Sequence, residues 1–271
     1  MMRWKLPALG AAISFLFMML AARKWKIPKR SAMIGAMASS FAAALPFVWL
    51  DSLCKSSKAK AAAMFGQVAL AFAFAITLIM RHFWRDPERI APEEKDIVLA
   101  PADGKILYIK TIDKGSIPLV TKHGRNFLLQ ELVGMNLMDN GAYVIGVEMN
   151  LLDVHVNRCP IDGQVKFVNH IEGTFISLGR AEAQFKNERC ITVIENPIVT
   201  LAVAQVASRL VRRIDNYLYA GQMVRAGQRL GMIRFGSLVA VVLPKRENIK
   251  LEAIVGNRVT AGVSILARSI I

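Results

Sequence analysis

The stretch GMIRFGSLVAVVLP, residues 231–244, has the apolar composition of a buried β-strand. Its middle carries the dipeptide Gly236-Ser237. Glycine weakens the interior of a strand, and it often marks a bulge or a close approach of two backbones. The dipeptide therefore has two explanations, a β-bulge or a serine that is placed for chemistry.

The C-terminal part of the sequence consists of short apolar alternations punctuated by Gly, Pro and Asp, which is typical of strands and tight turns. Two weak repeats occur in it. APADGKILYI (100–109) matches CPIDGQVKFV (159–168), and GQMVRAGQRL (221–230) matches GNRVTAGVSI (256–265). Asp-Gly and Ala-Gly before alternating apolar residues indicate turns. We therefore expect a mainly β soluble domain over residues 83–271, as a compact sandwich or barrel of short strands and hairpins.

Residues 1–82 contain three long apolar runs and are expected to form a membrane-anchoring helical region, with transmembrane or membrane-embedded helices. The run at 61–80 has the length of a spanning helix, whereas the runs at 6–22 and 31–50 are marginal, the latter because Pro46 interrupts it. A signal peptide is the alternative for the first run, and an interfacial helix is the alternative for the second.

The basic cluster RKWKIPKR at 23–30 directly follows the first run and favours a retained anchor. By the positive-inside rule this loop is cytoplasmic, and three spans then place the β domain on the cytoplasmic side of the cell (inner) membrane. The net charge of +15 and the pI of about 10.1 fit Lys and Arg beside anionic lipid. Nucleic acid is not an expected partner, because the sequence has no basic helix, zinc spacing or aromatic RNA-binding pattern.

The three cysteines, Cys54, Cys159 and Cys190, form no C-x-x-C pair, and their odd number argues against a complete disulfide framework. We expect small buried thiols in a reducing compartment. No metal site is expected.

The hydroxyl of Ser237 needs a neighbouring base, because a serine is a weak nucleophile until its proton is taken. Of the four histidines, His155 is the best candidate, since it lies in a strand-like alternation with polar neighbours. Asp103, Asp153 and Asp162 are the carboxylates that could orient this histidine. Two of them precede a glycine, as ordinary turn residues do, so the residues alone leave the choice open.

Five motifs occur in one order along the C-terminal part of the chain. They are FWRDPERIAP (83–92), APADGKI (100–106), LLDVHVNRCPIDGQV (151–165), FKNER (185–189) and GQRLGMIRFGS (227–237). This set resembles the phosphatidylserine decarboxylases, most closely their short forms with an F-G-S processing site. The resemblance covers residues 83–267.

The resemblance implies a zymogen that cuts itself between Gly236 and Ser237. Ser237 Oγ would attack the carbonyl carbon of Gly236, and elimination and hydrolysis would leave a pyruvoyl group, the cofactor, at position 237. His155 would be the general base and Asp103 its orienting partner. The implied activity is the conversion of phosphatidylserine to phosphatidylethanolamine and CO2 through a Schiff base that accepts electrons, a step of phospholipid biosynthesis.

The implied partners are an anionic phospholipid membrane, the lipid substrate and the cleaved C-terminal fragment, and a homo-oligomer is compatible with the sequence. The candidates for the substrate phosphate are Arg85, Arg89, Arg158 and Arg189. The chain departs from the short forms after Ser237, where LVAVV replaces the usual R-V-D-V-Y. Leu238 and Ala240 thus stand at charged positions, which leaves the choice of head group open, a related archaetidylserine-type lipid included.

A rival from another class is a non-catalytic carrier or membrane adaptor, because GQMVRAGQRLGMI (221–233) resembles a lipoyl or biotinyl hairpin. Such carriers need an exposed lysine on the hairpin, and adaptors need long heptad helices. The sequence has neither feature at this place.

Overall fold

The structure is a computed structural model, and it describes residues 5–24, 27–53, 56–112, 141–173, 187–207, 213–234 and 237–269. The chain divides into two compact units. The helical unit is Met1–Arg85 with Asn150–Leu152, and the β unit is Asp86–Met149 with Asp153–Ile271.

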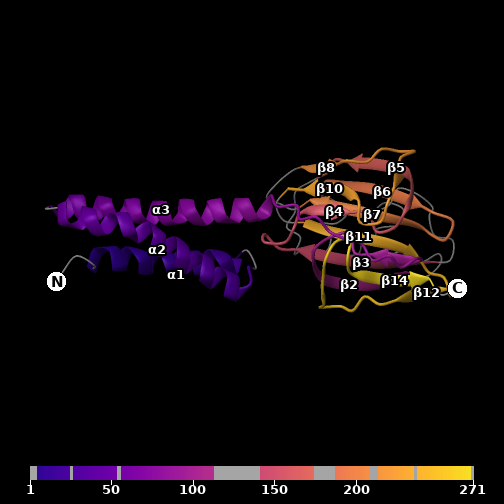
Figure 1. Cartoon of the computed structure of the whole chain (residues 1–271), viewed down its shortest axis with the longest axis horizontal. Helices are drawn as coiled ribbons and strands as arrows, with labels where there is room; N and C mark the ends of the chain where they lie inside the picture. The colour runs from indigo at the N-terminus through magenta and orange to yellow at the C-terminus, as the bar shows by residue number, and fades with distance from the viewer. Residues whose placement is uncertain are drawn as a thin grey trace, which may run out of the picture. The chain divides into compact units, whose positions relative to one another are not determined.

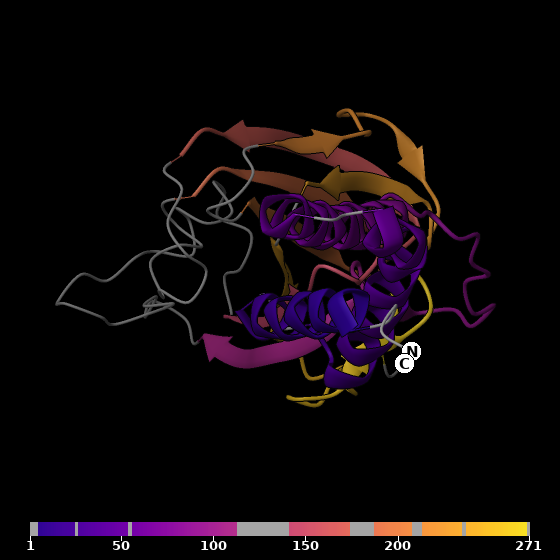
Figure 2. The ribbon, with the colours of Figure 1, turned by 90° about the vertical axis from the view of Figure 1, so that its left-hand side faces the viewer.

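The helical unit consists of α1 (Lys5–Lys24), α2 (Lys29–Leu53) and α3 (Ser57–Phe83), which pack side by side in Figures 1 and 2. Small side chains make this packing close, with Ala36, Ala43 and Ala71 buried around Met18. The side chain of Gln67 is also buried, and its Nε2 donates to the carbonyl of Pro7 at 2.7 Å. A polar group in this apolar bundle is therefore paired, as burial requires.

Two helical segments, Lys29–Val48 and Ser57–Phe83, are long and apolar enough to cross a membrane, whereas Pro7–Arg23 is shorter. Large apolar side chains on α3 point outward, and Phe65 is 77 % exposed. Water would penalise such a surface and lipid would not. The expectation of N-terminal apolar helices is confirmed, and these features indicate membrane association.

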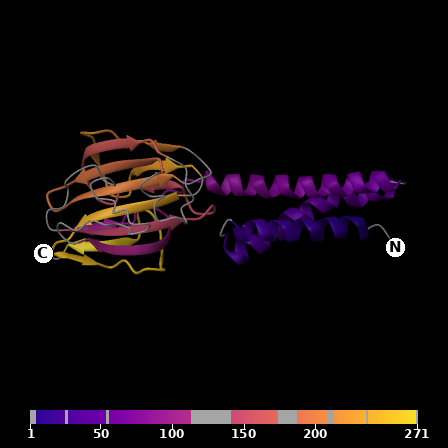
Figure 3. The same ribbon diagram turned by 180° about the vertical axis from the view of Figure 1, so that it is seen from behind.

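Within the described residues, the β unit has one eight-stranded antiparallel sheet and two three-stranded sheets. Figures 1 and 3 show the strands of these sheets as arrows. In spatial order the large sheet is β13 (Arg258–Val259), β2 (Gly104–Ile112), β3 (Ala142–Met149), β11 (Ser237–Pro244), β7 (Thr200–Ala207), β6 (Arg189–Glu195), β5 (Gly163–Ile171) and β9 (Met223–Val224). The small sheets are β1 (Ile97–Leu99), β14 (Ile265–Ser269) and β12 (Ile249–Leu251), and β4 (Val156–Arg158), β10 (Arg229–Ile233) and β8 (Ile214–Asn216). The expectation of a mainly β domain is confirmed.

The large sheet is buried on both faces at its centre, where β11 lies between β3 and β7. Val239, Val241 and Leu243 join the core that the large sheet shares with the two small sheets. Ala240 and Val242 join a second apolar cluster on the other face. This division follows from the two-residue period of a strand, and it explains why the sequence of β11 is almost continuously apolar.

The two sequence repeats fold as related units that make the same hydrogen bonds. Asp103 Oδ1 accepts from the amide of Ala261 at 2.9 Å, and Asp162 Oδ1 accepts from the amide of Ala226 at 2.7 Å. Two backbone hydrogen bonds recur in the same way. The bond from Gly256 N to Ile106 O (2.8 Å) corresponds to that from Gly221 N to Val165 O (2.7 Å). The bond from Gly262 N to Ala100 O corresponds to that from Gly227 N to Cys159 O, and both are 2.8 Å long. Each P-x-D-G turn therefore binds one V-x-A-G turn, and the two halves are quasi-symmetric.

We predict that Gly104→Ala and Gly163→Ala both destabilise the protein, by about 2 kcal/mol or more. A Cβ at either position would lie 2.3 Å from a backbone carbonyl oxygen, that of Glu148 or Glu195. Gly256→Ala is the matched control, because its Cβ would meet only the end of Lys105, at 3.9 Å, and it bears only the strain of its positive φ. Thermal unfolding of the full chain in detergent measures the difference. Equal losses in all three variants would contradict the prediction.

Candidate active site

The Gly236–Ser237 bond lies where the chain passes from one sheet to another. Ile233 ends β10 in a small sheet, and Ser237 begins β11 in the large sheet. Gly236 and the side chain of Ser237 lie outside the described residues, but the backbone of Ser237 is paired with Met149 of β3 and Ala207 of β7. The start of β11 is thus held on both edges.

His155 is fully buried and lies close to this crossing. Its carbonyl accepts a hydrogen bond from the amide of Ile233 at 3.3 Å, three residues before Gly236. Its Nδ1 lies 2.8 Å from the carbonyl oxygen of Asp153. Since a carbonyl can only accept, Nδ1 carries the proton, and in the neutral ring Nε2 is then the basic nitrogen. The imidazole is therefore oriented as a proton acceptor.

The carboxylate of Asp103 is bound by Arg89, whose Nη1 and Nη2 donate to its two oxygens at 2.6 and 2.8 Å. Its third hydrogen bond comes from the Ala261 amide. Among the described contacts, therefore, Asp103 is paired with a guanidinium rather than with His155. Of the three carboxylate residues, Asp153 is the one in contact with His155, through its backbone.

Two of the arginine candidates have carboxylate partners inside the protein. Arg89 binds Asp103, and Arg158, whose side chain is 4 % exposed, binds Asp86 at 2.9 Å and the carbonyls of Pro87 and Gly227. Bidentate pairing and burial hold both guanidiniums in place, so the contacts of these two residues are structural ones.

The other two candidates differ in their surroundings. Arg189 is buried at the start of β6 and donates to the carbonyl of Asn187 at 3.4 Å. Arg85 ends the helical unit, and its Nη1 donates to the carbonyl of His82 at 2.8 Å.

A buried pair of amides near the crossing was missed by the sequence reasoning. Gln205 of β7 and Asn157 of β4 are both fully buried, and Gln205 Nε2 donates to Asn157 Oδ1 at 2.8 Å. The signal was present as a single polar residue inside the apolar strand TLAVAQVA (200–207). A polar residue at a core position is rare enough to indicate a specific role.

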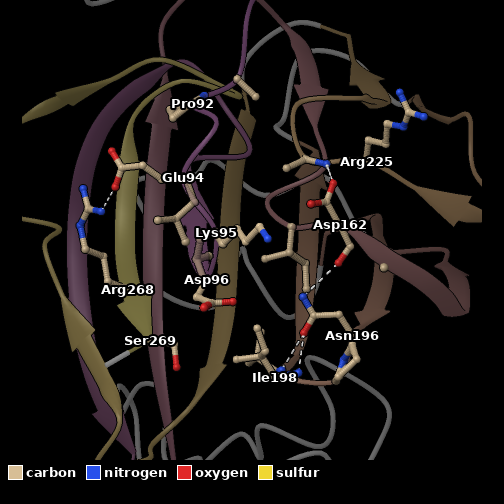
Figure 4. A pocket seen from close by; sticks show the side chains of 18 of the residues that line it. Pro92, Glu94, Lys95, Asp96, Asp162, Asn196, Ile198, Arg225, Arg268 and Ser269 are labelled. Carbon is tan, nitrogen blue, oxygen red and sulfur yellow. Dashed lines mark hydrogen bonds and ion pairs between the residues drawn. The ribbon is translucent and has the colours of Figure 1, made fainter. Parts of the chain in front are cut away.

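A cavity of about 850 Å³ lies elsewhere in the β unit, and Figure 4 shows its charged lining. It borders Val199, just before β7 begins, whereas Ser237 pairs with Ala207 at the other end of that strand. The rise of a strand separates the two ends by about 25 Å. The cavity is therefore not the environment of the Gly236–Ser237 bond.

Two of the cysteines are buried in the β unit, and Cys54 lies outside the described residues. Burial, with the charge of Asp162 in second place, raises the pKa of Cys159 to about 12. Burial also raises the pKa of Cys190, against the opposing effect of a hydrogen bond from Asn216. Both thiols are therefore protonated at neutral pH and are poor nucleophiles.

We predict that Cys159 and Cys190 resist iodoacetamide in the folded protein between pH 7 and about 9 and react once it is unfolded. A raised pKa means that the thiolate is scarce until the pH exceeds the usual value of about 8.5. Peptide mass spectrometry after timed labelling measures both sites. Labelling of the native protein at the rate of free cysteine would contradict the assignment.

The comparisons with known proteins agree with the sequence motifs. A family model described as phosphatidylserine decarboxylase matches residues 76–267. A putative archaetidylserine decarboxylase proenzyme of Methanocaldococcus jannaschii is 38% identical over 193 residues, covering 71% of this chain and 91% of that protein. A phosphatidylserine decarboxylase proenzyme of Chlorobium limicola is 34% identical over 200 residues, covering 74% and 84%.

Proposed function

Because this chain belongs to the phosphatidylserine decarboxylase family, we propose that it is a proenzyme that cuts itself at Gly236–Ser237 and then decarboxylates a serine phospholipid. In this proposal residues 1–82 anchor the protein at the cell membrane. Residues 83–271 form the catalytic domain on the cytoplasmic side, where the substrate headgroup meets it.

The observation that carries the proposal is the position of His155. Its backbone is bonded to Ile233, so a buried imidazole with a basic Nε2 lies beside the segment that leads into Gly236. The hydrogen bond of Nδ1 to the Asp153 carbonyl fixes the tautomer of this imidazole and leaves Nε2 as its proton acceptor. This supports His155 as the base that activates Ser237.

The self-processing steps use the residues of the chain alone. His155 takes the hydroxyl proton of Ser237 as Oγ attacks the carbonyl carbon of Gly236, and the C–N bond breaks to leave an ester and a free amine. Loss of the α-proton of residue 237 and departure of the Gly236 carboxylate give dehydroalanine. Addition of water and release of ammonia then give the pyruvoyl group, and the buried surroundings keep water from hydrolysing the ester first.

The residues around position 237 fit a reactive carbonyl there. Met149 and Ala207, its partners in the ladder, are buried on the interior face of the sheet, and Asn157 and Gln205 add polar groups to that interior. When present, the pyruvoyl ketone condenses with the substrate amine and accepts the electrons that CO2 leaves behind. The start of the doubly paired strand β11 would hold this group.

The substrate proposed is a membrane lipid with a phosphoserine headgroup, since serine phospholipids of both kinds appear in the names of the relatives. The basic clusters beside the apolar helices would raise the local concentration of such an anionic lipid. The four arginine candidates for the phosphate stay as predicted from the sequence, and two of them, Arg89 and Arg158, also bind carboxylates.

We predict that the purified protein runs as two pieces on a denaturing gel and that Ser237→Ala runs as one. His155→Ala should slow the cut at least about 100-fold, the usual contribution of a positioned base. His170→Ala is the control, because this histidine is at the surface, paired with Glu188 at 2.9 Å, and should leave the cut unchanged. An uncut wild type after long incubation would remove the proposed function.

Asp103→Asn and Asp162→Asn form a second, matched test. Each aspartate accepts an amide hydrogen bond in the same turn of its repeat, and asparagine keeps an oxygen for it. If Asp103 supports the chemistry, only Asp103→Asn should slow the cut, by about 10-fold or more. Equal rates in the two variants, measured on gels over time, would limit Asp103 to its structural bonds.

The lipid specificity can be measured directly. Vesicles that contain carboxyl-labelled serine lipid with either ester-linked or ether-linked tails should both release labelled CO2 with the wild type. Ser237→Ala should release none, because it cannot make the ketone. Release from neither lipid by a fully cut protein would contradict the proposed activity.

A further inference from the structure

The side-chain amide of Gln205 is buried, and within the described residues its nitrogen is hydrogen-bonded whereas its oxygen is not. Its Nε2 is engaged with Asn157 Oδ1, whereas Oε1 accepts no hydrogen bond in the part of the chain that the structure describes. The whole residue is 0% exposed. A buried amide oxygen without a donor costs free energy, so this one calls for a specific explanation.

The register places this amide next to the reactive position. Ser237 pairs with Ala207 on β7, and Gln205 is two residues along the same strand, on the same face of the sheet. Diagonal neighbours in an antiparallel pair lie about 7–8 Å apart, within the reach of a glutamine side chain. Gln205 thus belongs to the interior layer in which residue 237 begins its strand.

The orientation of the amide is fixed by the opposite sheet. Asn157 lies on β4, two residues after His155, and pairs with Gly231 of β10. Its Oδ1 receives the Gln205 bond, and its Nδ2 lies 3.8 Å from the Met149 sulfur. Gly231, opposite Asn157, has no side chain, and a Cβ there would come within 3.1 Å of Gln205 Nε2. Because Nε2 is engaged with Asn157, Oε1 is the atom of this amide that remains to accept a hydrogen bond.

The chemistry of the headgroup identifies what this oxygen binds. A phosphoserine headgroup offers a carboxylate, a phosphate and an amine, and its hydroxyl is esterified, so the amino nitrogen is its one hydrogen-bond donor. On the basis of the function proposed above, we infer that Gln205 Oε1 accepts a hydrogen bond from the amino nitrogen of the lipid substrate and aims it at position 237, with Asn157 holding the amide. Gln205 is then a substrate-binding residue of the reaction.

A neutral amide suits this task better than a carboxylate. The amine must lose its proton to attack a carbonyl, and a nearby negative charge would favour the protonated, unreactive form. An amide oxygen accepts from the amine without adding a full charge to the buried layer. The apolar surroundings strengthen this hydrogen bond.

The test separates self-cleavage from use of the substrate amine. In Gln205→Met, which keeps the volume, the cut at Gly236–Ser237 should proceed as in the wild type. The covalent adduct of the small fragment with the lipid amine, trapped by cyanoborohydride and weighed by intact mass spectrometry, should form about 10- to 100-fold more slowly. CO2 release should fall by the same factor. Thr192→Val, a buried polar-to-apolar change on the next strand, should leave both rates unchanged.

Each other outcome has a defined meaning. If Gln205→Met is cut and forms the adduct at the normal rate, the inference is overturned and the proposed function stays intact. If Gln205→Met folds but is not cut, the inference is likewise overturned and the proposed function likewise stays intact. A wild type that neither cuts nor forms an adduct overturns both. If methionine prevents folding, Gln205→Asn keeps the polarity but withdraws the oxygen by one methylene, and it should show the same slowed adduct with a normal cut. Normal adduct formation there overturns the inference as well.

Discussion

Strand β11 is hydrogen-bonded along both edges and buried on both faces, and the architecture of the β unit depends on that constraint. A strand so placed keeps its position even when the peptide bond before it is broken. Two of the three strands that follow it also pair with strands from before the dipeptide: β13 pairs with β2, and β14 pairs with β1. A chain cut at Gly236–Ser237 would therefore remain one folded body, held by ladders between its two fragments.

The segment that joins β10 to β11 is held at both ends. Before the crossing, the amide of Ile233 is bonded to His155, and after it, the backbone of Ser237 is bonded to two strands. Both ends of the short connection are thus fixed by ladders in different sheets. A glycine in the connection has the conformational range that such a short path needs. The sequence of this stretch thus meets two requirements. The residues after the Gly-Ser dipeptide are buried, and the glycine itself has a wide range of allowed backbone conformations.

The sequence predicted the mainly β class and the apolar N-terminal helices because alternation and long apolar runs are local signals. It also revealed the two repeats, whose turns bind one another. It did not reveal that Arg89 forms an ion pair with Asp103, because two residues that are 14 positions apart and meet only in the fold give no periodic pattern in the sequence. Gln205 was missed for a related reason: its partner Asn157 lies 48 residues away on another sheet, and only the fold brings the two amides together.

The departures after Ser237 can be assigned to a face of the sheet. Ala240 belongs to the cluster on the side away from the two small sheets, near Tyr108, whose ring lies where a side chain at Gly146 would be. Leu238 shares that side by the alternation of the strand. Gln205 belongs to the opposite side, with Val239. Leu238 and Ala240 therefore lie on the face opposite to Gln205, so an apolar pair at these positions leaves the polar groups of the Gln205 face unchanged.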